Sequence, residues 1–141
     1  MTLEDLDQCL PNGLHDARIK TLTHDYERAT VKLEVEILVG MPDDPPPERY
    51  GYRNGEILFQ RVAFCSVEAP ENARILGHSG SIWFKFQRTE AGSLPGKILE
   101  ALPSETLRYS HYILDWESQI HIAAGDLSFS WSDNSEALAA K

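Results

Sequence analysis

The chain has 141 residues, with 13 Lys and Arg against 22 Asp and Glu, which gives a formal net charge of 13 − 22 = −9. This length fits a single domain, 1–141, and an apolar content of 42% excludes a wholly disordered chain. The acidic excess argues against a nucleic-acid-binding surface, because neutralising phosphates requires clustered Lys and Arg. The acidic start lacks the basic opening of a signal peptide, and no apolar run reaches the roughly 18–20 residues of a membrane helix. We therefore expect a cytoplasmic protein that binds neither nucleic acid nor membrane.

Leucines recur at roughly helical spacing near the N-terminus, at Leu3, Leu6 and Leu10. The spacing predicts one or two helical turns over residues 2–9, which the Pro-Asn-Gly sequence that follows brings to an end. Because residues 1–10 are acidic, we expect them to form a mobile N-terminal segment.

Apolar and polar residues alternate from Ala29 to Val39, which is the clearest strand pattern in the chain. A weaker strand from Arg18 to His24 precedes it, and the two are expected to form a hairpin that turns near residues 25–28. The next segment, residues 40–47, contains three successive prolines, which favour polyproline II and cannot lie inside a sheet. It is either a stiff surface loop or a docking segment for a proline-binding partner.

Further strand patterns follow at hairpin spacing. Asn54–Gly55 predicts a tight hairpin turn, and the strand from 57 to 67 changes the phase of its alternation near Gln60–Arg61, which predicts a β-bulge there. The remaining expected elements are strands over 81–88, 107–116, 119–124 and 126–131, a helix over 94–102, and a frayed tail over 133–141. These elements predict an α+β, mainly β fold. Its twisted antiparallel sheet of about seven strands is folded into a sandwich or partial barrel, with one or two short helices.

The five histidines show no spacing typical of a metal-binding motif. His111 and His121 lie on neighbouring predicted strands, so the register of these strands decides whether they meet. A two-residue turn at 117–118 places His111 opposite Ala124 and His121 opposite Leu114, which puts the two imidazoles on opposite faces of the sheet. The core face then holds His111 together with Tyr109, Ile113 and Ile122. We expect neither a metal nor a cofactor.

His15–Asp16 is the most suggestive dipeptide, because it follows a turn and leads into the first predicted strand. A histidine beside a carboxylate can act as a general base. The structural alternative is that Asp16 accepts hydrogen bonds from the backbone of the turn while His15 covers the end of the core. An enzyme or a metal-dependent ligand site would combine these two residues with His24 or His121 in a cleft of the sheet.

Three aromatic and apolar residues, Tyr112, Leu114 and Trp116, share the strand face opposite to the core face. If another layer covers that face, they belong to the core; otherwise they form an exposed patch of the kind enriched at interfaces. The acidic loops 43–48 and 115–117 are further candidate contacts for a basic partner.

Three stretches of the chain share one family pattern: Leu10-Pro-Asn-Gly-Leu-His-Asp-Ala-Arg-Ile, Ile57-Leu-Phe-Gln-Arg-Val, and Ile-x-Ile-x-Ala-x-x-Leu over 120–127. They resemble the immunity protein 50 family of small bacterial domains, and Asp25 falls near the acidic residue that closes the first strand in such sequences. The resemblance implies a domain that binds and neutralises a toxin protein, and it brings no catalytic residue.

Our leading interpretation is a protein-binding domain of the immunity type, whose partner is a basic protein such as a toxin. The candidate binding residues are His15, Asp16, Asp25, Tyr112, Asp115, Trp116 and Glu117. The alternatives are a small enzyme or a metal- or ligand-binding protein that uses His15 and Asp16, and an accessory domain with a purely structural role.

Overall fold

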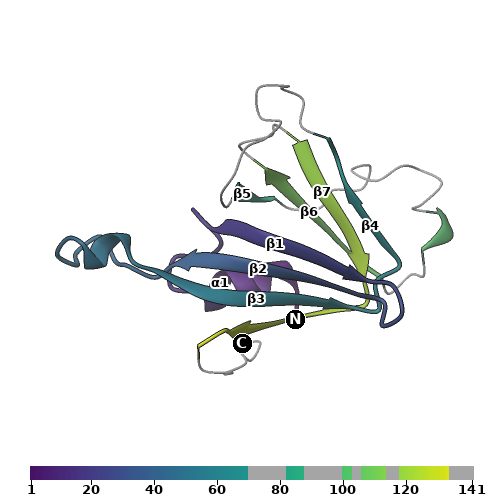
Figure 1. The fold of residues 1–141 in the computed structure, drawn as a ribbon, viewed down its shortest axis with the longest axis horizontal. Coiled ribbons are helices and arrows are strands. Elements are labelled where there is room, and N and C mark those ends of the chain that lie inside the picture. Colours follow the sequence, from purple (N-terminus) through teal and green to yellow (C-terminus); the bar gives the residue numbers. More distant parts are fainter. Residues whose placement is uncertain (70–81, 88–99, 103–105, 114–117, 134–141) are drawn as a thin grey trace.

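The computed structural model describes residues 1–69, 82–87, 100–102, 106–113 and 118–133. In this part of the chain the elements are α1 (Leu3–Cys9), β1 (Arg18–Asp25), β2 (Thr30–Leu38), η1 (Glu48–Tyr50), β3 (Tyr52–Gln60), β4 (Phe64–Val67), β5 (Ile82–Gln87), β6 (Leu107–Ile113), β7 (Ser118–Ala124) and β8 (Asp126–Trp131). The eight strands form an antiparallel sheet in the order β4-β7-β6-β5-β1-β2-β3-β8 (Figure 1). The predicted class, a mainly β fold with an antiparallel sheet and a short helix, is confirmed.

The sheet has two halves that join through a short contact. Strands β1, β2, β3 and β8 form one half, and β4, β7, β6 and β5 form the other. Among the described residues, β1 pairs with β5 over two residue pairs, Arg18 with Trp83 and Ile19 with Ile82. In Figure 1 the strands β4, β6 and β7 make a large angle with β1, β2 and β3, so the two halves of the sheet are rotated relative to each other.

The halves also meet at a corner where two long strand pairs bend. β3 pairs with β8 and β4 pairs with β7, and the single residue Gly125 separates β7 from β8. Arg61 follows β3 with a left-handed φ of 52°, and the Val62 N–H donates to the Ala29 carbonyl at 2.8 Å. The bulge predicted near Gln60–Arg61 is therefore confirmed, and it turns the chain from one half of the sheet into the other. The sheet remains open, with β4 and β8 as its end strands.

The inner face of β2 lies at the centre of the core. Its buried and half-buried residues alternate, as the period-2 pattern predicts, and the fully buried ones are Val31, Leu33, Val35 and Ile37. Burying each such side chain stabilises the fold by roughly 1.5–3 kcal/mol. The prediction of a strand and hairpin here is confirmed, except that Ala29 belongs to the turn, where its φ is 52°.

Helix α1 packs against this core and is capped at its start. The Asp5 N–H donates to the Thr2 hydroxyl at 3.1 Å, and the Thr2 N–H donates to an Asp5 carboxylate oxygen at 2.7 Å. The buried leucines of the helix and the turn after it are Leu3, Leu6, Leu10 and Leu14. The predicted helical turns are confirmed, but the leucines make residues 1–10 part of the core. Such packing does not fit the mobile segment that we expected from the acidic composition.

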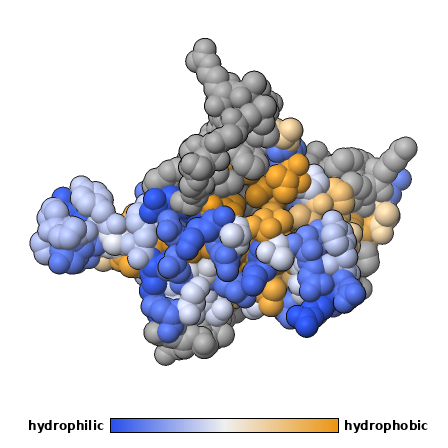
Figure 2. All heavy atoms as spheres, in the orientation of Figure 1, coloured by the Kyte–Doolittle hydropathy of each residue, from blue (hydrophilic) through white to orange (hydrophobic). Residues whose placement is uncertain are grey.

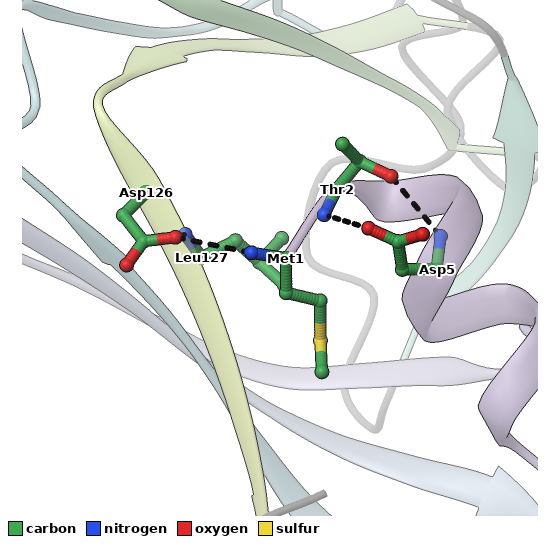
Figure 3. A network of polar contacts seen from close by, with 5 residues as sticks. All are labelled: Met1, Thr2, Asp5, Asp126 and Leu127. Carbon is green, nitrogen blue, oxygen red and sulfur yellow. Dashed lines mark hydrogen bonds and ion pairs between the residues drawn. The ribbon is translucent and has the colours of Figure 1, made fainter. Parts of the chain in front are cut away.

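A polar network ties this N-terminal segment to β8 (Figure 3). The Met1 ammonium lies 3.3 Å from Asp126 Oδ1, and the same oxygen accepts the Leu127 N–H at 2.8 Å. The pKa of the Asp126 carboxyl is lowered from its usual value, mainly by the hydrogen bond from the Leu127 N–H. The Met1 ammonium lowers it further. The network therefore contributes stability that needs an ionised Asp126.

Gly55 overturns one of the turn predictions. It lies inside β3, paired with Val35 on one side and Trp131 on the other, so Asn54–Gly55 is not a hairpin turn. A Cβ at position 55 would come within 2.5 Å of the Phe129 ring. Gly55 therefore makes room for a core side chain, and pairing on both edges of the strand outweighs the local preference for a turn.

Two further predictions fall partly or wholly outside the described residues. Of the helix over 94–102, only Glu100 and Ala101 show helical backbone, because residues 94–99 lie outside the described part. Of the tail over 133–141, only Asp133 is described, and its Oδ1 lies 2.9 Å from the Arg53 guanidinium. This contact lowers the pKa of the Asp133 carboxyl.

Candidate functional site

His15 and Asp16 lie on the surface just before β1. His15 Nε2 and Asp16 Oδ2 are 3.3 Å apart, and the two side chains are 82% and 46% exposed. Asp16 has a left-handed φ of 59°, so this dipeptide is not extended and its side chains come together. His15 is too exposed to cover the core, and in this turn it is Asp7 that accepts the Leu14 N–H, at 2.7 Å.

Asp25 closes the hairpin between β1 and β2. Its Oδ1 accepts the Arg28 N–H at 3.0 Å, which fixes the turn. The rings of His24 and Tyr26 stack beside it with their centroids 4.1 Å apart. Asp25 therefore has a structural role, and it presents a half-exposed carboxylate at this end of the sheet.

The register of β6 and β7 differs from the predicted one. His111 pairs with Ile120 and His121 pairs with Ser110, because four residues, 114–117, separate the strands instead of a two-residue turn. The shift moves the pairing by four positions, an even number, so positions 111 and 121 keep their predicted alternation along the two strands. Tyr109, Ile113 and Ile122 are all buried, so the prediction that they belong to the core is confirmed.

His121 has a carboxylate partner that the sequence did not indicate. Its side chain is buried, and Nε2 lies 2.8 Å from Glu68 Oε1. Backbone contacts hold Glu68 in place, since its N–H donates to the Gln119 carbonyl at 3.0 Å and its Oε2 accepts the Gln119 N–H at 3.3 Å. A histidine oriented by a carboxylate has the geometry of a general base, and it also serves to satisfy a buried polar ring. The two residues are 53 positions apart, so only the pairing of β4 with β7 brings them together.

Of the other predicted binding residues, only Tyr112, on β6, is described. Tyr112 pairs with Gln119 and is half-buried. Asp115, Trp116 and Glu117 lie outside the described residues, as does Leu114. The predicted patch on this strand therefore stays a prediction.

Charged side chains on the outer face of β1, β2 and β3 contact charged or polar partners on the same face. The contacts are Arg18 with Glu36 at 3.1 Å, Lys32 with Glu56 at 3.8 Å, and the Thr21 hydroxyl with Glu34 at 2.7 Å. Lys20 reaches the amide oxygen of Asn54 at 3.5 Å on the same face. The three cations and three anions cancel, so this face, which Figure 2 shows as largely hydrophilic, has no net charge.

The surplus negative charge of this half lies elsewhere. Residues 1–60 contain 6 Lys and Arg and 12 Asp and Glu, a net charge of 6 − 12 = −6. The neutral strand face contributes none of it. The net charge is −4 in residues 1–16, −1 in the turn over 25–28 and −2 in residues 40–51, and Arg53 adds +1. Most of the excess thus lies in the N-terminal segment that packs on the core, and the rest lies in the connections between β1 and β2 and between β2 and β3.

The half-buried thiol of Cys65 and the buried phenol of Tyr109 are both held in their neutral forms. Burial raises the pKa of the Cys65 thiol, and burial together with nearby carboxylates raises that of the Tyr109 phenol. Both shifts favour the neutral, unreactive form. Within the described residues, no three His, Cys, Asp or Glu side chains gather as a metal site would require.

Comparisons with known proteins add no relative. No family model matches the chain, and neither does any curated protein or solved structure. Among the described residues, no helix has the length and apolar character needed to cross a membrane.

Proposed function

We propose that this chain is a cytoplasmic protein-binding domain of the immunity type, which neutralises a basic protein such as a toxin. The observation that carries the proposal is the placement of its charge. Opposite charges cancel on the strand face, while the excess of −6 in residues 1–60 comes from residues 1–16, the turn over 25–28 and residues 40–51. An excess of negative charge outside the neutral face attracts a basic partner and speeds its association.

The resemblance to the immunity protein 50 family supports the same function. Its best-matched stretch includes His15 and Asp16, and these two residues lie on the surface where a partner can reach them. Asp25 presents its carboxylate at the opposite end of β1. Together with the 43–48 loop they are candidate contacts, and so are Asp115, Trp116 and Glu117.

Capture of the partner tests the proposal. The tagged chain is mixed at low salt with lysate of the cells from which its gene comes, and any captured protein is identified, purified and tested again. We expect a basic protein whose affinity falls by about tenfold or more when the salt concentration is raised, because screening weakens charge attraction. We also expect that co-expression of the chain restores growth to cells in which the captured protein is toxic.

Two results would contradict the proposal. One is the absence of any specific basic partner at low salt. The other is a captured protein whose toxicity the chain does not relieve.

A second candidate, a small enzyme or metal-dependent ligand binder, is favoured by one observation, the 2.8 Å contact between His121 and Glu68. The predicted site of this candidate combined His15 and Asp16 together with His24 or His121. The proposed site now consists of His121 and Glu68 instead. Chain purified without chelators or a histidine tag is analysed for metal and heated with a panel of divalent ions. Stoichiometric metal, or a thermal shift that His121→Gln abolishes, supports this candidate; no metal and no shift remove its metal-dependent form.

A further inference from the structure

The connection between β2 and β3 is much longer than the hairpin needs. The strands pair as far as Leu38 and Tyr52, and the Val39 and Gly40 N–H groups both donate to the Gly51 carbonyl, at 2.9 and 3.2 Å. A two-residue turn would already connect strands at this point. Instead, residues 40–51, here called the lobe, extend beyond the ends of the neighbouring strands (left side of Figure 1).

Hydrogen bonds within the lobe hold it in one shape. The Met41 N–H donates to an Asp44 carboxylate oxygen at 2.8 Å, and the Asp44 N–H donates back to the Met41 carbonyl at 3.0 Å. The Arg49 guanidinium donates to the Asp44 carbonyl at 3.1 Å, and the Tyr50 N–H to the Pro47 carbonyl at 3.0 Å. The lobe is therefore ordered before any partner arrives, which lowers the entropy lost on binding.

The base of the lobe is fixed to the body of the protein. The Asn12 side-chain amide donates to the carbonyls of Leu38 and Gly40, each at 2.9 Å. At Gly40 the chain passes so close to the other side of the base that a Cβ would lie 2.3 Å from the Arg49 carbonyl oxygen. The lobe thus projects in a defined direction from the sheet.

The lobe places large side chains in solvent within an acidic setting. Tyr50 is 66% exposed and Met41 is 47% exposed, which makes them two of the four large exposed hydrophobic residues in the described part of the chain. The lobe carries Asp43, Asp44 and Glu48 against Arg49, a net charge of 1 − 3 = −2. Tyrosine and methionine are enriched in interface centres, and charge is concentrated at interface rims.

The other hairpin of this sheet provides a comparison. Tyr26, in the turn between β1 and β2, is 82% exposed, but its ring stacks on His24. Among the described residues, no such ring partner is found for Tyr50. The two tyrosines are at opposite ends of the β1–β3 sheet, and only Tyr50 belongs to a projecting, acidic, internally bonded segment.

We propose that the lobe is a preformed docking element, in which Tyr50 inserts into an apolar hollow of a basic protein while Asp43, Asp44 and Glu48 meet lysines and arginines around that hollow. This inference rests on the proposed function and names the surface that performs it. Charge complementarity decides the occupant: a surface of −2 favours a basic protein over a second copy of this acidic chain.

The experiment places a photoreactive benzoylphenylalanine at position 50 or at position 26 of the intact chain, in the cells from which its gene comes. The affinity of Tyr50→Ala and Tyr26→Ala for the basic protein captured by the intact chain is then measured. We expect cross-linking to that basic protein from position 50 only, and an affinity loss of about tenfold or more for Tyr50→Ala against less than about twofold for Tyr26→Ala. Both side chains are exposed, so circular dichroism should show that both variants keep the fold.

Each other outcome overturns the inference. If the intact chain captures a basic protein but Tyr50→Ala binds it as well as the wild type does, the docking element is wrong and the proposed function stands. If position 50 cross-links to a second copy, to a proline-binding protein without basic character, or to nothing, the inference fails as well. If the intact chain captures no basic protein at all, the proposed function fails with it.

Discussion

Two acidic segments of this chain differ in whether their apolar side chains are buried or exposed. Residues 1–16 carry a net charge of −4 and send four leucines into the core, whereas the lobe over 40–51 carries −2 and leaves Met41 and Tyr50 in solvent. In both segments a carboxylate accepts a hydrogen bond from a backbone N–H: Asp7 from Leu14 in the first, and Asp44 from Met41 in the lobe. Their acidic character alone does not separate them. The spacing of apolar residues does, because only the first segment can bury a row of leucines on one side.

The difference indicates what each segment is for. The first stabilises the fold, so changes in it should lower the free energy of unfolding. The exposed side chains of the lobe contribute little to the core, so changes in these side chains should affect the binding of a partner and leave stability nearly unchanged.

The largest expected effect is from Leu6→Ala. Leu6 is fully buried under the sheet, and we expect the variant to lose about 2–5 kcal/mol of unfolding free energy in urea denaturation. Met41→Ala is the control in the lobe, and its change should stay within about 0.5 kcal/mol. Equal losses in the two variants would show that the lobe is part of the core.

Asp7→Ala should have the next largest effect. It removes the acceptor of the Leu14 N–H, and a hydrogen bond to a charged group contributes about 1.5–3 kcal/mol. The lobe carboxylate Asp43 is exposed, so Asp43→Ala should change the unfolding free energy by no more than about 0.5 kcal/mol. The same urea titration measures both, and a stable Asp7→Ala variant would contradict the role given to this turn.

Gly40→Ala tests the base of the lobe. The added methyl would lie 2.3 Å from two carbonyl oxygens, so the backbone must move apart, at a cost of about 1–3 kcal/mol. Gly51→Ala is the matched control, since its methyl would be 3.1 Å from the Glu48 carbonyl and a small shift relieves it. Hydrogen exchange should report faster exchange of the Met41 and Tyr50 amides in Gly40→Ala only. Unchanged exchange in both variants would mean that the base is not tightly closed.

The smallest effect concerns pH. The Thr2 N–H and hydroxyl hold the pKa of the Asp5 carboxyl below its usual value. A lowered native pKa contributes stability above the unfolded value of 3.8, and this contribution is lost as the pH falls through the native pKa. The difference in unfolding free energy between wild type and Asp5→Asn should therefore be present at neutral pH and shrink below about pH 4. A difference that grows on acidification would contradict this sign.

Much of the fold could be predicted because its signals are local. The alternation over β2, the leucine spacing of α1 and the change of phase at Arg61 each lie within a few residues. The prediction of a turn at Asn54–Gly55 was wrong because β3 pairs with a strand on each edge, and this pairing outweighs the local preference for a turn.

The candidate site was harder to predict because its contacts connect distant residues. Glu68 and His121 meet only through the pairing of β4 with β7, and no spacing in the sequence marks them as partners. The register of β6 and β7 depends on the length of their connection, which the sequence does not fix. The lobe was recognised as proline-rich and acidic, but its internal hydrogen bonds and the exposure of Tyr50 appear only in the folded chain.

Replacing the lobe separates its part in folding from its part in binding. In this variant an Asn-Gly turn takes the place of residues 40–50 and joins Val39 to Gly51, so that β2 and β3 keep their register. We predict that the variant folds, with an unfolding free energy within about 1 kcal/mol of the wild type, and that it no longer binds the basic protein captured by the intact chain. A variant that folds and binds that protein with unchanged affinity would contradict the account.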